Sequence, residues 1–444
     1  MKKTTLFFIA LFSLSTFVFC SPVAGDDNHR LVEYFSSKAV PLASTSDLDR
    51  IIAEAGNRKL ALLGESSHGT SEFYSWRAKI SKRLISEKKF SFIAVEGDWA
   101  SIHRLNQYVK NAPGALKSAK EVLRSFKRWP EWMWANTDIE QLAEWLRKYN
   151  MNLPDHKKVG FYGMDVYGQW EAMDDLLEFT KKYLQEHHPE IQRKVQCFAH
   201  YDRDEWMYAM SVSRKQYSSC QSGLIEVVNL LGTLRVENNA AKDRKFFRAE
   251  QNALVVKNAE DFFRLAIADN TASWNSRVNH MWLSVKRMLK LYGPDSKGIV
   301  WAHNTHVGDS DATSMHLHGR VNIGNLSRNE LGRGKVFIIG FGTYTGRVCA
   351  GSKWGSAMEK MQIPPGRKDS YEDIFSRLEQ ENFYLLFDQD DRNNQLLNQY
   401  RGHRAIGVVY DPRNEAGNYV PTILPQRYDA FIFIRHTNPL EQVR

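Results

Sequence analysis

The sequence contains few cysteines and no motif in which they would bind a metal. Only four of the 444 residues are Cys, which excludes a small scaffold held together by many disulfides. Neither a Cys-x-x-Cys pair nor a Cys/His spacing typical of zinc sites occurs. Three cysteines follow the N-terminal segment: Cys197, Cys220 and Cys349. Cys197 and Cys220 can pair in an exported protein if their Cα atoms approach each other, which sequence spacing alone does not show.

The sequence also lacks the short motifs of several large enzyme classes. It has no Gly-x-Ser-x-Gly turn for a serine nucleophile, no phosphate-binding P-loop and no Gly-x-Gly-x-x-Gly after a strand. With 43% hydrophobic and 25% charged residues the composition is that of an ordinary globular protein, so disorder and collagen-like repeats are excluded. The formal net charge is +9, but no basic motif accompanies it, and we predict no nucleic-acid partner.

The longest strongly apolar segment lies at the N-terminus, and no later segment is long and apolar enough to span a membrane. Lys2 and Lys3 precede an apolar stretch at residues 6–20 that is too short to span a bilayer comfortably, and polar residues 26–28 follow it. This pattern is typical of a secretory signal peptide, which we assign to residues 1–24. We therefore predict a periplasmic or secreted protein without stable membrane insertion. A lipoprotein signal fits less well, because bulky residues 17–19 precede Cys20.

The remaining chain alternates strand and helix signals. Near-continuous apolar runs predict strands at residues 59–63, 90–95, 158–162, 298–301, 335–340, 384–387, 405–410 and 429–434. Helical periodicity covers residues 71–89, and Thr137 is a suitable cap for a helix at 138–149. These patterns predict an α/β fold with a mainly parallel central sheet flanked by helices.

Residues 169–292 differ from the rest because they carry hardly any strand signal. Long periodic stretches such as 241–267 and 273–291 dominate this segment, and Gly293-Pro294 ends the second of them. We predict an inserted, all-helical lobe at 169–292. The α/β core then has a first part at 25–168 and a second part at 293–444.

Polar residues directly follow five of the predicted strands. In open α/β sheets, ligands bind at the carboxyl ends of the strands. Four of these five ends carry an acid or a His: Glu65 with His68, Glu96, Asp165, and His303 with His306. The sequence therefore predicts a functional site at this edge of the sheet.

His68 is the strongest candidate for a general base toward water, because its pKa range lies nearest to neutrality. Glu65, three residues earlier, is placed to orient the imidazole, and Gly64 and Gly69 would let the loop turn sharply and approach a ligand. The same loop is also compatible with a simple helix cap at Ser66, Ser67 or Thr70.

Three further features have more than one interpretation. Glu96 at a strand end needs a partner, for which Arg77 is a candidate. His303 and His306 are suited to zinc ligation beside Glu65 and His68, and equally to donating hydrogen bonds to an oxyanion. The tryptophan-rich segment 129–134 is suited to lining an apolar cleft or to packing as a loop.

Several segments together resemble the erythromycin esterase family: Gly64-Glu65-Ser66-Ser67-His68-Gly69, Val95-Glu96-Gly97-Asp98-Trp99, Ala302-His303-Asn304-Thr305-His306 and Gly340-Phe341-Gly342-Thr343. Residues 342–355, 404–410 and 427–433 are similar to this family as well and occur in the same order. The resemblance implies an α/β core with a helical lobe and a deep cleft at the strand carboxyl ends. It further implies hydrolysis of a macrolide lactone or another bulky ester by His-activated water, without a metal or other cofactor.

The resemblance also suggests roles for individual residues. His68 is the expected general base, Glu65 its supporting acid, and Glu96, Arg77 and His303 complete the catalytic set, with Arg77 and His303 as oxyanion donors. We expect His306, Trp99, Asp165 and Thr343 to bind a small-molecule ester, and the protein to be a monomer. Arg277 departs from the family pattern, because Val278 follows it where Asp is common, so we expect an acid-dependent contact to be lost there.

Two other functions are compatible with these residues. One is a metal-dependent hydrolase of the cell envelope that uses Glu65, His68, His303 and His306 as ligands. The other is an envelope protein that binds a ligand in the cleft without catalysis.

Overall fold

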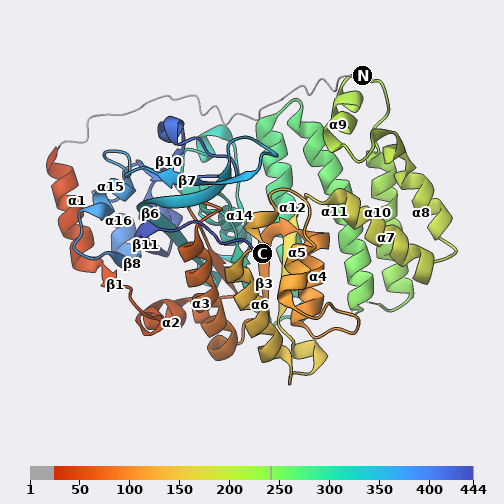
Figure 1. Cartoon of the computed structure of the whole chain (residues 1–444), viewed down its shortest axis with the longest axis horizontal. Coiled ribbons are helices and arrows are strands. Elements are labelled where there is room, and N and C mark those ends of the chain that lie inside the picture. The colour runs from red at the N-terminus through yellow and green to blue at the C-terminus, as the bar shows by residue number, and fades with distance from the viewer. Residues whose placement is uncertain (1–24, 241–242, 444) are drawn as a thin grey trace.

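The computed structural model describes residues 25–240 and 243–443 of the chain. The signal peptide predicted at residues 1–24 lies outside the described residues. Within them, a nine-stranded sheet has the order β1-β8-β11-β6-β2-β5-β3-β4, with β7 paired to β6 (Figure 1). Its strands are β1 (Val40–Pro41), β2 (Leu60–Leu63), β3 (Phe92–Asp98), β4 (Gly160–Asp165), β5 (Gly298–Trp301), β6 (Val336–Gly351), β7 (Met358–Ile363), β8 (Asn382–Leu386) and β11 (Ala430–Thr437).

The central strands are parallel, as predicted. β11, β6, β2, β5, β3 and β4 form parallel pairs, whereas β1, β7 and β8 pair antiparallel with their neighbours. Every residue of β2 and β5 is buried. Along β2, Leu60 and Leu62 pack into one hydrophobic cluster and Ala61 and Leu63 into another. Because both faces of the sheet are covered, these strands are apolar throughout instead of alternating with polar residues.

Helices cover the two faces of the sheet. The core helices are α1 (Gly25–Lys38), α2 (Asp49–Gly56), α3 (Ser71–Lys88), α4 (Trp99–Val109), α5 (Ala119–Arg124), α6 (Thr137–Asn150), α13 (Asn304–Val307), α14 (Ile323–Leu331), α15 (Tyr371–Ser376), α16 (Gln389–Asn393) and α17 (Leu424–Arg427). Apolar residues of α2, α3 and α6 pack on one face, and those of α1, α14 and α15 on the other. The cap of α6 is Asn136 and not Thr137, because the Asn136 side chain accepts from the Ile139 amide.

The described residues of the segment without strand signals, 169–240 and 243–292, form helices joined by turns and loops. Its α-helices are α7 (Gln169–Tyr183), α8 (His188–Val195), α9 (Glu205–Ser213), α10 (Gln221–Glu237), α11 (Arg244–Ala266) and α12 (Asn270–Tyr292). In Figure 1, α7 to α11 lie together at the right of the sheet. Cys197 and Cys220 form a disulfide here, with their Cα atoms 5.8 Å apart, and Cys349 is free and buried.

One predicted strand is wrong. Residues 405–410 form only isolated bridges, Ser67 with Ile406 and Gly351 with Val409. The neighbouring β9 (Arg401–Arg404) pairs with β10 (Tyr419–Thr422) in a separate two-stranded sheet. The apolar character of 405–410 instead serves side-chain packing, because Ile406 and Tyr410 belong to a small buried cluster beside β6.

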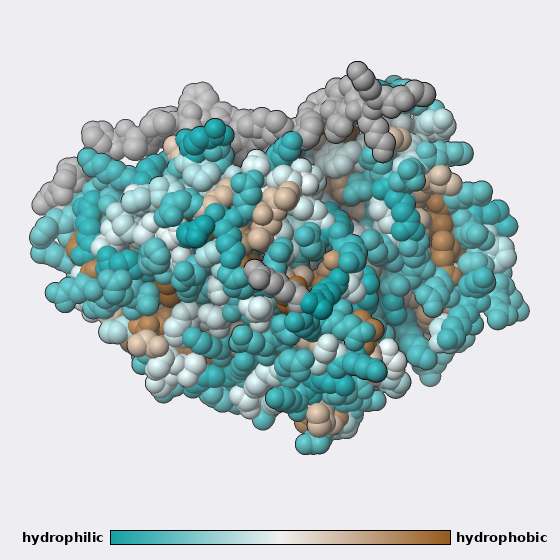
Figure 2. Space-filling model, in the orientation of Figure 1, coloured by the Kyte–Doolittle hydropathy of each residue, from teal (hydrophilic) through white to brown (hydrophobic). Residues whose placement is uncertain are grey.

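The surface shown in Figure 2 and the helices of the described residues bear on how the protein meets solvent and membrane. The face in Figure 2 is mostly hydrophilic, with hydrophobic residues in small groups. Among the described residues, no helix is both long and apolar enough to cross a membrane.

Candidate functional site

Glu65 joins His68 to Arg77 in the loop after β2. His68 Nδ1 lies 3.0 Å from Glu65 Oε1, and Arg77 Nη2 donates to Glu65 Oε2 over 2.6 Å. Arg77 is fully buried between the rings of Tyr74 and Trp301, 4.4 and 4.7 Å from their centroids. Both oxygens of the carboxylate are therefore engaged, which fixes the orientation of the His68 ring.

The two loop glycines serve close packing and not a left-handed turn. A Cβ on Gly64 would meet Asn304 Oδ1 at 2.0 Å, and one on Gly69 would meet the Cys349 carbonyl oxygen at 1.9 Å. The Asn304 amide also donates to the Glu65 carbonyl over 2.8 Å. The glycines thus let the β2 loop lie directly against the loop after β5 and against β6.

A second polar group forms around Glu96 at the end of β3. Arg277 Nη2 donates to Glu96 Oε1 over 2.8 Å, and His306 Nε2 lies 3.2 Å from the same oxygen. Arg277 Nε and Nη2 also donate to the two carboxylate oxygens of Asp165 over 2.8 and 2.6 Å. This bidentate pair holds the guanidinium between the ends of β3 and β4.

Helix α12 contributes two side chains to these groups from the helical segment. Trp274 lies one turn before Arg277 and stacks on the His306 ring, with centroids 4.5 Å apart and planes at 7°. Residues three apart lie on the same face of a helix, so Trp274 and Arg277 reach the strand ends together.

His303 connects the two groups. Its backbone amide donates to Glu96 Oε2 over 2.8 Å, and its ring lies 4.9 Å from the His68 ring, centroid to centroid. Its Nδ1 accepts from the Thr305 amide over 3.3 Å, so the proton of the neutral ring is on Nε2. That Nε2 is buried and has no side-chain hydrogen-bond partner among the described residues, while the Ser66 backbone interacts with the ring. His303 therefore presents a donor beside His68.

The buried charges of the site shift the pKa values of His68 and His303 in opposite directions. Burial opposes a positive charge on His68, but the charges of Glu96 and Glu65 outweigh it and hold the pKa of His68 above its ordinary value. Burial and the adjacent His68 hold the pKa of His303 well below its ordinary value. Burial opposes a negative charge on Glu96, yet His306, His68 and Arg277 hold its pKa well below the usual range.

A buried network of hydrogen bonds holds the loop after β5 in place. Asn304 Nδ2 donates to the Phe341 carbonyl over 2.7 Å and to His403 Nε2 over 3.1 Å. His403 Nδ1 in turn donates to Glu372 Oε1 over 2.7 Å. Asn304 thereby anchors the loop that carries His303 and His306.

The structure brings most of the predicted site residues together but places two of them elsewhere. Trp99 begins α4 and stacks on Tyr162, with centroids 5.7 Å apart, inside the hydrophobic core. The Thr343 hydroxyl bonds within the β6–β11 ladder, to the Thr345 carbonyl and the Thr437 hydroxyl. Neither side chain takes part in the hydrogen bonds around His68 and Glu96 described above.

Sequence reasoning missed the role of Arg277. We expected its acidic contact to be lost because Val278 follows it, but Asp165 supplies the acid from the end of β4. Asp165 was itself predicted for the site, and its need for a cationic partner was the available signal.

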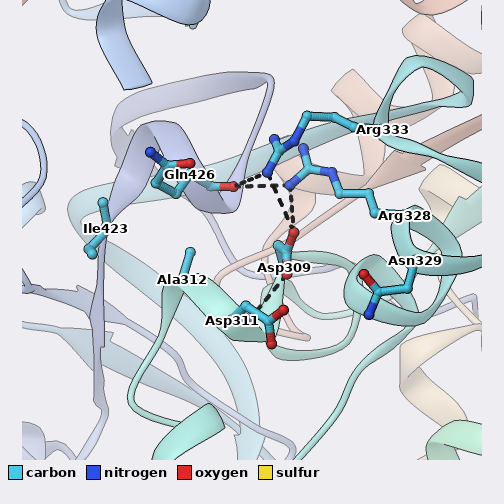
Figure 3. Close-up of a pocket in the computed structure, with 8 residues that line it drawn as sticks. All are labelled: Asp309, Asp311, Ala312, Arg328, Asn329, Arg333, Ile423 and Gln426. Atoms are coloured by element: carbon cyan, nitrogen blue, oxygen red, sulfur yellow. Dashed lines mark hydrogen bonds and ion pairs between the residues drawn. The ribbon is translucent and has the colours of Figure 1, made fainter. Parts of the chain in front are cut away.

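The polar groups are nearly enclosed. His68, Glu96 and His303 are only 7%, 6% and 4% exposed. A cavity of about 410 Å³ lies elsewhere, near α14, and is shown in Figure 3. There Arg328 binds Asp309 over 3.0 Å and Asp429 over 2.8 Å, an ion-pair network that joins α14 to the start of β11.

The arrangement of ligand-type side chains bears on the metal hypothesis. Among the residues that the structure describes, no three His, Cys, Asp or Glu side chains are grouped as a metal site requires. Glu65 is occupied by Arg77 and His68, and Glu96 by Arg277 and His306.

Comparison with known proteins identifies the family. The sequence profile of the erythromycin esterase family matches residues 85–437, and the chain belongs to that family. Membership implies a hydrolase. The matched range includes Glu96, Arg277 and His303 but begins after the His68 loop.

Individual relatives are distant. Erythromycin esterase type II of Escherichia coli is 20% identical over 353 residues, which cover 75% of this chain and 81% of that protein. A succinoglycan biosynthesis protein of known structure has a TM-score of 0.76 at 20% identity, covering 95% of this chain and all of the other. A mutant erythromycin esterase in its open conformation has a TM-score of 0.64 at 15% identity, covering 90% of this chain and 97% of that one. These structures share the α/β fold.

Proposed function

We propose that the protein is an exported hydrolase that cleaves a lactone or another bulky carboxylic ester with water activated by His68, without a metal. The pairing of His68 with Glu65 carries this proposal. Glu65 accepts from His68 Nδ1, which leaves Nε2 as the proton acceptor of the ring. A carboxylate in this position also stabilises the imidazolium that forms when the proton is taken.

Arg77 supports the base and does not contact substrate. It is fully buried behind Glu65, so the role of oxyanion donor that the sequence suggested for it does not fit its position. His303 and Arg277 are better placed for that role, because the His303 ring lies beside the His68 ring, the Arg277 guanidinium lies beside Glu96, and both carry N–H donors.

The proposed reaction has two steps, the addition of water to the ester carbonyl and the departure of the alcohol. His68 Nε2 takes a proton as water attacks the ester carbonyl, and the resulting oxyanion accepts hydrogen bonds from His303 and Arg277. As the carbon–oxygen bond breaks, His68 returns the proton to the leaving alkoxide. The products are a carboxylic acid and an alcohol, which remain in one molecule if the substrate is a lactone.

A hydrolysis screen tests this function. Purified protein is incubated with simple esters, lactones and macrolides, and mass spectrometry detects products that have gained one water. We expect a water-added product from at least one bulky ester or lactone. Binding without any such product favours the non-catalytic alternative.

Metal dependence is tested separately on the substrate found. We expect the protein to keep its activity after chelation and removal of metal. Stoichiometric metal that is required for turnover would contradict the metal-independent proposal and favour the metal-dependent alternative.

The proposed export rests on two observations. The first is the signal-like sequence at residues 1–24, and the second is the disulfide between Cys197 and Cys220, a bond typical of oxidising compartments. Fractionation of cells that express the full chain tests this proposal, with the N-terminal sequence of the mature protein showing where cleavage falls.

A further inference from the structure

Three aromatic side chains from separate loops lie next to the proposed active site. Tyr167 follows Asp165 at the end of β4, Trp354 follows the end of β6, and Trp129 begins the tryptophan-rich segment at 129–134. We refer to Tyr167, Trp129 and Trp354 as the aromatic trio. The ring centroids of Trp129 and Trp354 are 4.7 Å apart, and those of Tyr167 and Trp354 are 6.2 Å apart.

The trio is joined to the catalytic groups through Arg277. The Arg277 guanidinium lies 5.0 Å from the centre of the Tyr167 ring, and the same guanidinium holds Glu96 and Asp165. On the other side, β6 runs beside the His68 loop, where the Cys349 amide donates to the Gly69 carbonyl over 3.0 Å. Trp354 thus extends from the strand that flanks His68, and Tyr167 extends from the strand end that holds Arg277.

The trio is held in place and yet partly open to solvent. Trp129 Nε1 donates to the Ser356 carbonyl over 2.8 Å, which fixes the turn that carries Trp354. Trp354 is 51% exposed, whereas Trp132 and Trp134 of the tryptophan-rich segment are buried. Large exposed aromatics held rigidly beside a polar site are typical of ligand-binding surfaces.

We propose that the aromatic trio binds the non-reacting part of the substrate through the C–H-rich face of a saturated ring. This inference rests on the proposed ester hydrolysis and deepens it by assigning a substrate subsite. The negative face of an indole or phenol ring attracts weakly positive C–H groups, and a saturated ring presents several of them in one plane. Both an aliphatic ring and a sugar ring have this chemistry.

Three butyrate esters test the subsite, because they share the reacting acyl group and differ only in the alcohol. They are ethyl butyrate, cyclohexylmethyl butyrate and methyl 6-O-butyryl-glucopyranoside. The measured quantity is the kcat/KM of each ring ester divided by that of ethyl butyrate. Trp354→Ala should lower this ratio about tenfold for at least one ring ester, a loss that corresponds to about 1.4 kcal/mol. The ester whose kcat/KM ratio falls shows whether the subsite binds an aliphatic ring or a sugar ring.

Two further variants control the experiment. Trp354→Phe keeps a ring face and should give an intermediate ratio. Tyr183→Ala removes an aromatic of similar exposure, 47%, which ends α7 in the helical lobe and packs on Phe179, and it should leave the ratios as in the wild type. Ratios that stay unchanged in Trp354→Ala, or that change equally in Tyr183→Ala, overturn the proposal.

Failure of the subsite is distinguishable from failure of the esterase function. If the wild type cleaves none of the three esters, saturation-transfer NMR is recorded with cyclohexylmethanol and methyl glucopyranoside as probes. Transfer to one probe that disappears in Trp354→Ala supports the subsite even without turnover. No transfer to either probe in the wild type overturns it.

Discussion

Arg277 of α12 donates to Glu96 of β3 over 2.8 Å, although 181 positions separate them in the chain. The same guanidinium closes a bidentate pair with Asp165 at the end of β4. One cation from the helical segment therefore neutralises two buried carboxylates of the sheet. The arrangement makes the site dependent on the packing of α12 against the strand ends.

Arg277→Met should destabilise the protein strongly. Removal of the cation leaves Asp165 buried without its bidentate partner and takes one of the positive neighbours from Glu96, and breaking a buried ion pair in this way typically costs about 3–5 kcal/mol of unfolding free energy. Urea denaturation at pH 7 measures this loss. The double variant Arg277→Met with Asp165→Asn should lose less, because one of the two unpaired charges is removed as well. A single variant as stable as the wild type would contradict the account.

Glu65→Gln should shift the pH dependence of hydrolysis to lower pH. The negative charge of Glu65 helps to hold the pKa of His68 above its ordinary value, so its loss lowers that pKa. His68 then becomes an unprotonated base at lower pH, and the acid limb of the kcat/KM profile moves in the same direction. The plateau rate should fall about 10²-fold or more, since the imidazolium loses its support.

A matched control separates this effect from a general change of charge. Glu54→Gln neutralises a carboxylate that is 56% exposed and pairs with Arg58 on the surface. Its pH profile should coincide with that of the wild type. An acid limb that stays in place in Glu65→Gln would show that Glu65 does not act on His68.

The Cys197–Cys220 disulfide should stabilise the chain by about 3 kcal/mol, because it closes a loop over a sequence separation of 23. Denaturation of a Cys197→Ser/Cys220→Ser variant measures this contribution. Dithiothreitol should destabilise the wild type and leave the variant unaffected. Equal sensitivity of both proteins to the reductant would argue against the bond.

The strands of the sheet centre were predictable because both of their faces are covered. A run such as Leu60–Leu63 has no polar residue and reads as a buried parallel strand. The same signal failed at 405–410, where apolar residues pack beside β6 without joining a ladder. Hydrophobicity reports burial, and only the hydrogen-bond pattern distinguishes a strand from a buried loop.

The site was predictable where polar residues follow strands, and not where a distant helix contributes. Glu65, Glu96 and Asp165 lie within two residues of the carboxyl ends of β2, β3 and β4, so their convergence follows from the parallel sheet. Arg277 and Trp274 reach the site through the packing of α12, which no local pattern reveals. Trp99 also follows a strand end in the sequence, but it begins α4 and its side chain packs in the hydrophobic core.

The most direct test of the central claim is the kcat/KM of His68→Asn on the ester or lactone that the wild type cleaves. The variant removes the base while the loop remains held by the Asn304 amide and the Cys349 contact. We expect a loss of about 10²–10⁴-fold, with an unchanged circular dichroism spectrum. His316→Asn, which alters a surface histidine whose side chain is 62% exposed, should retain full activity. Full activity in His68→Asn would contradict the mechanism.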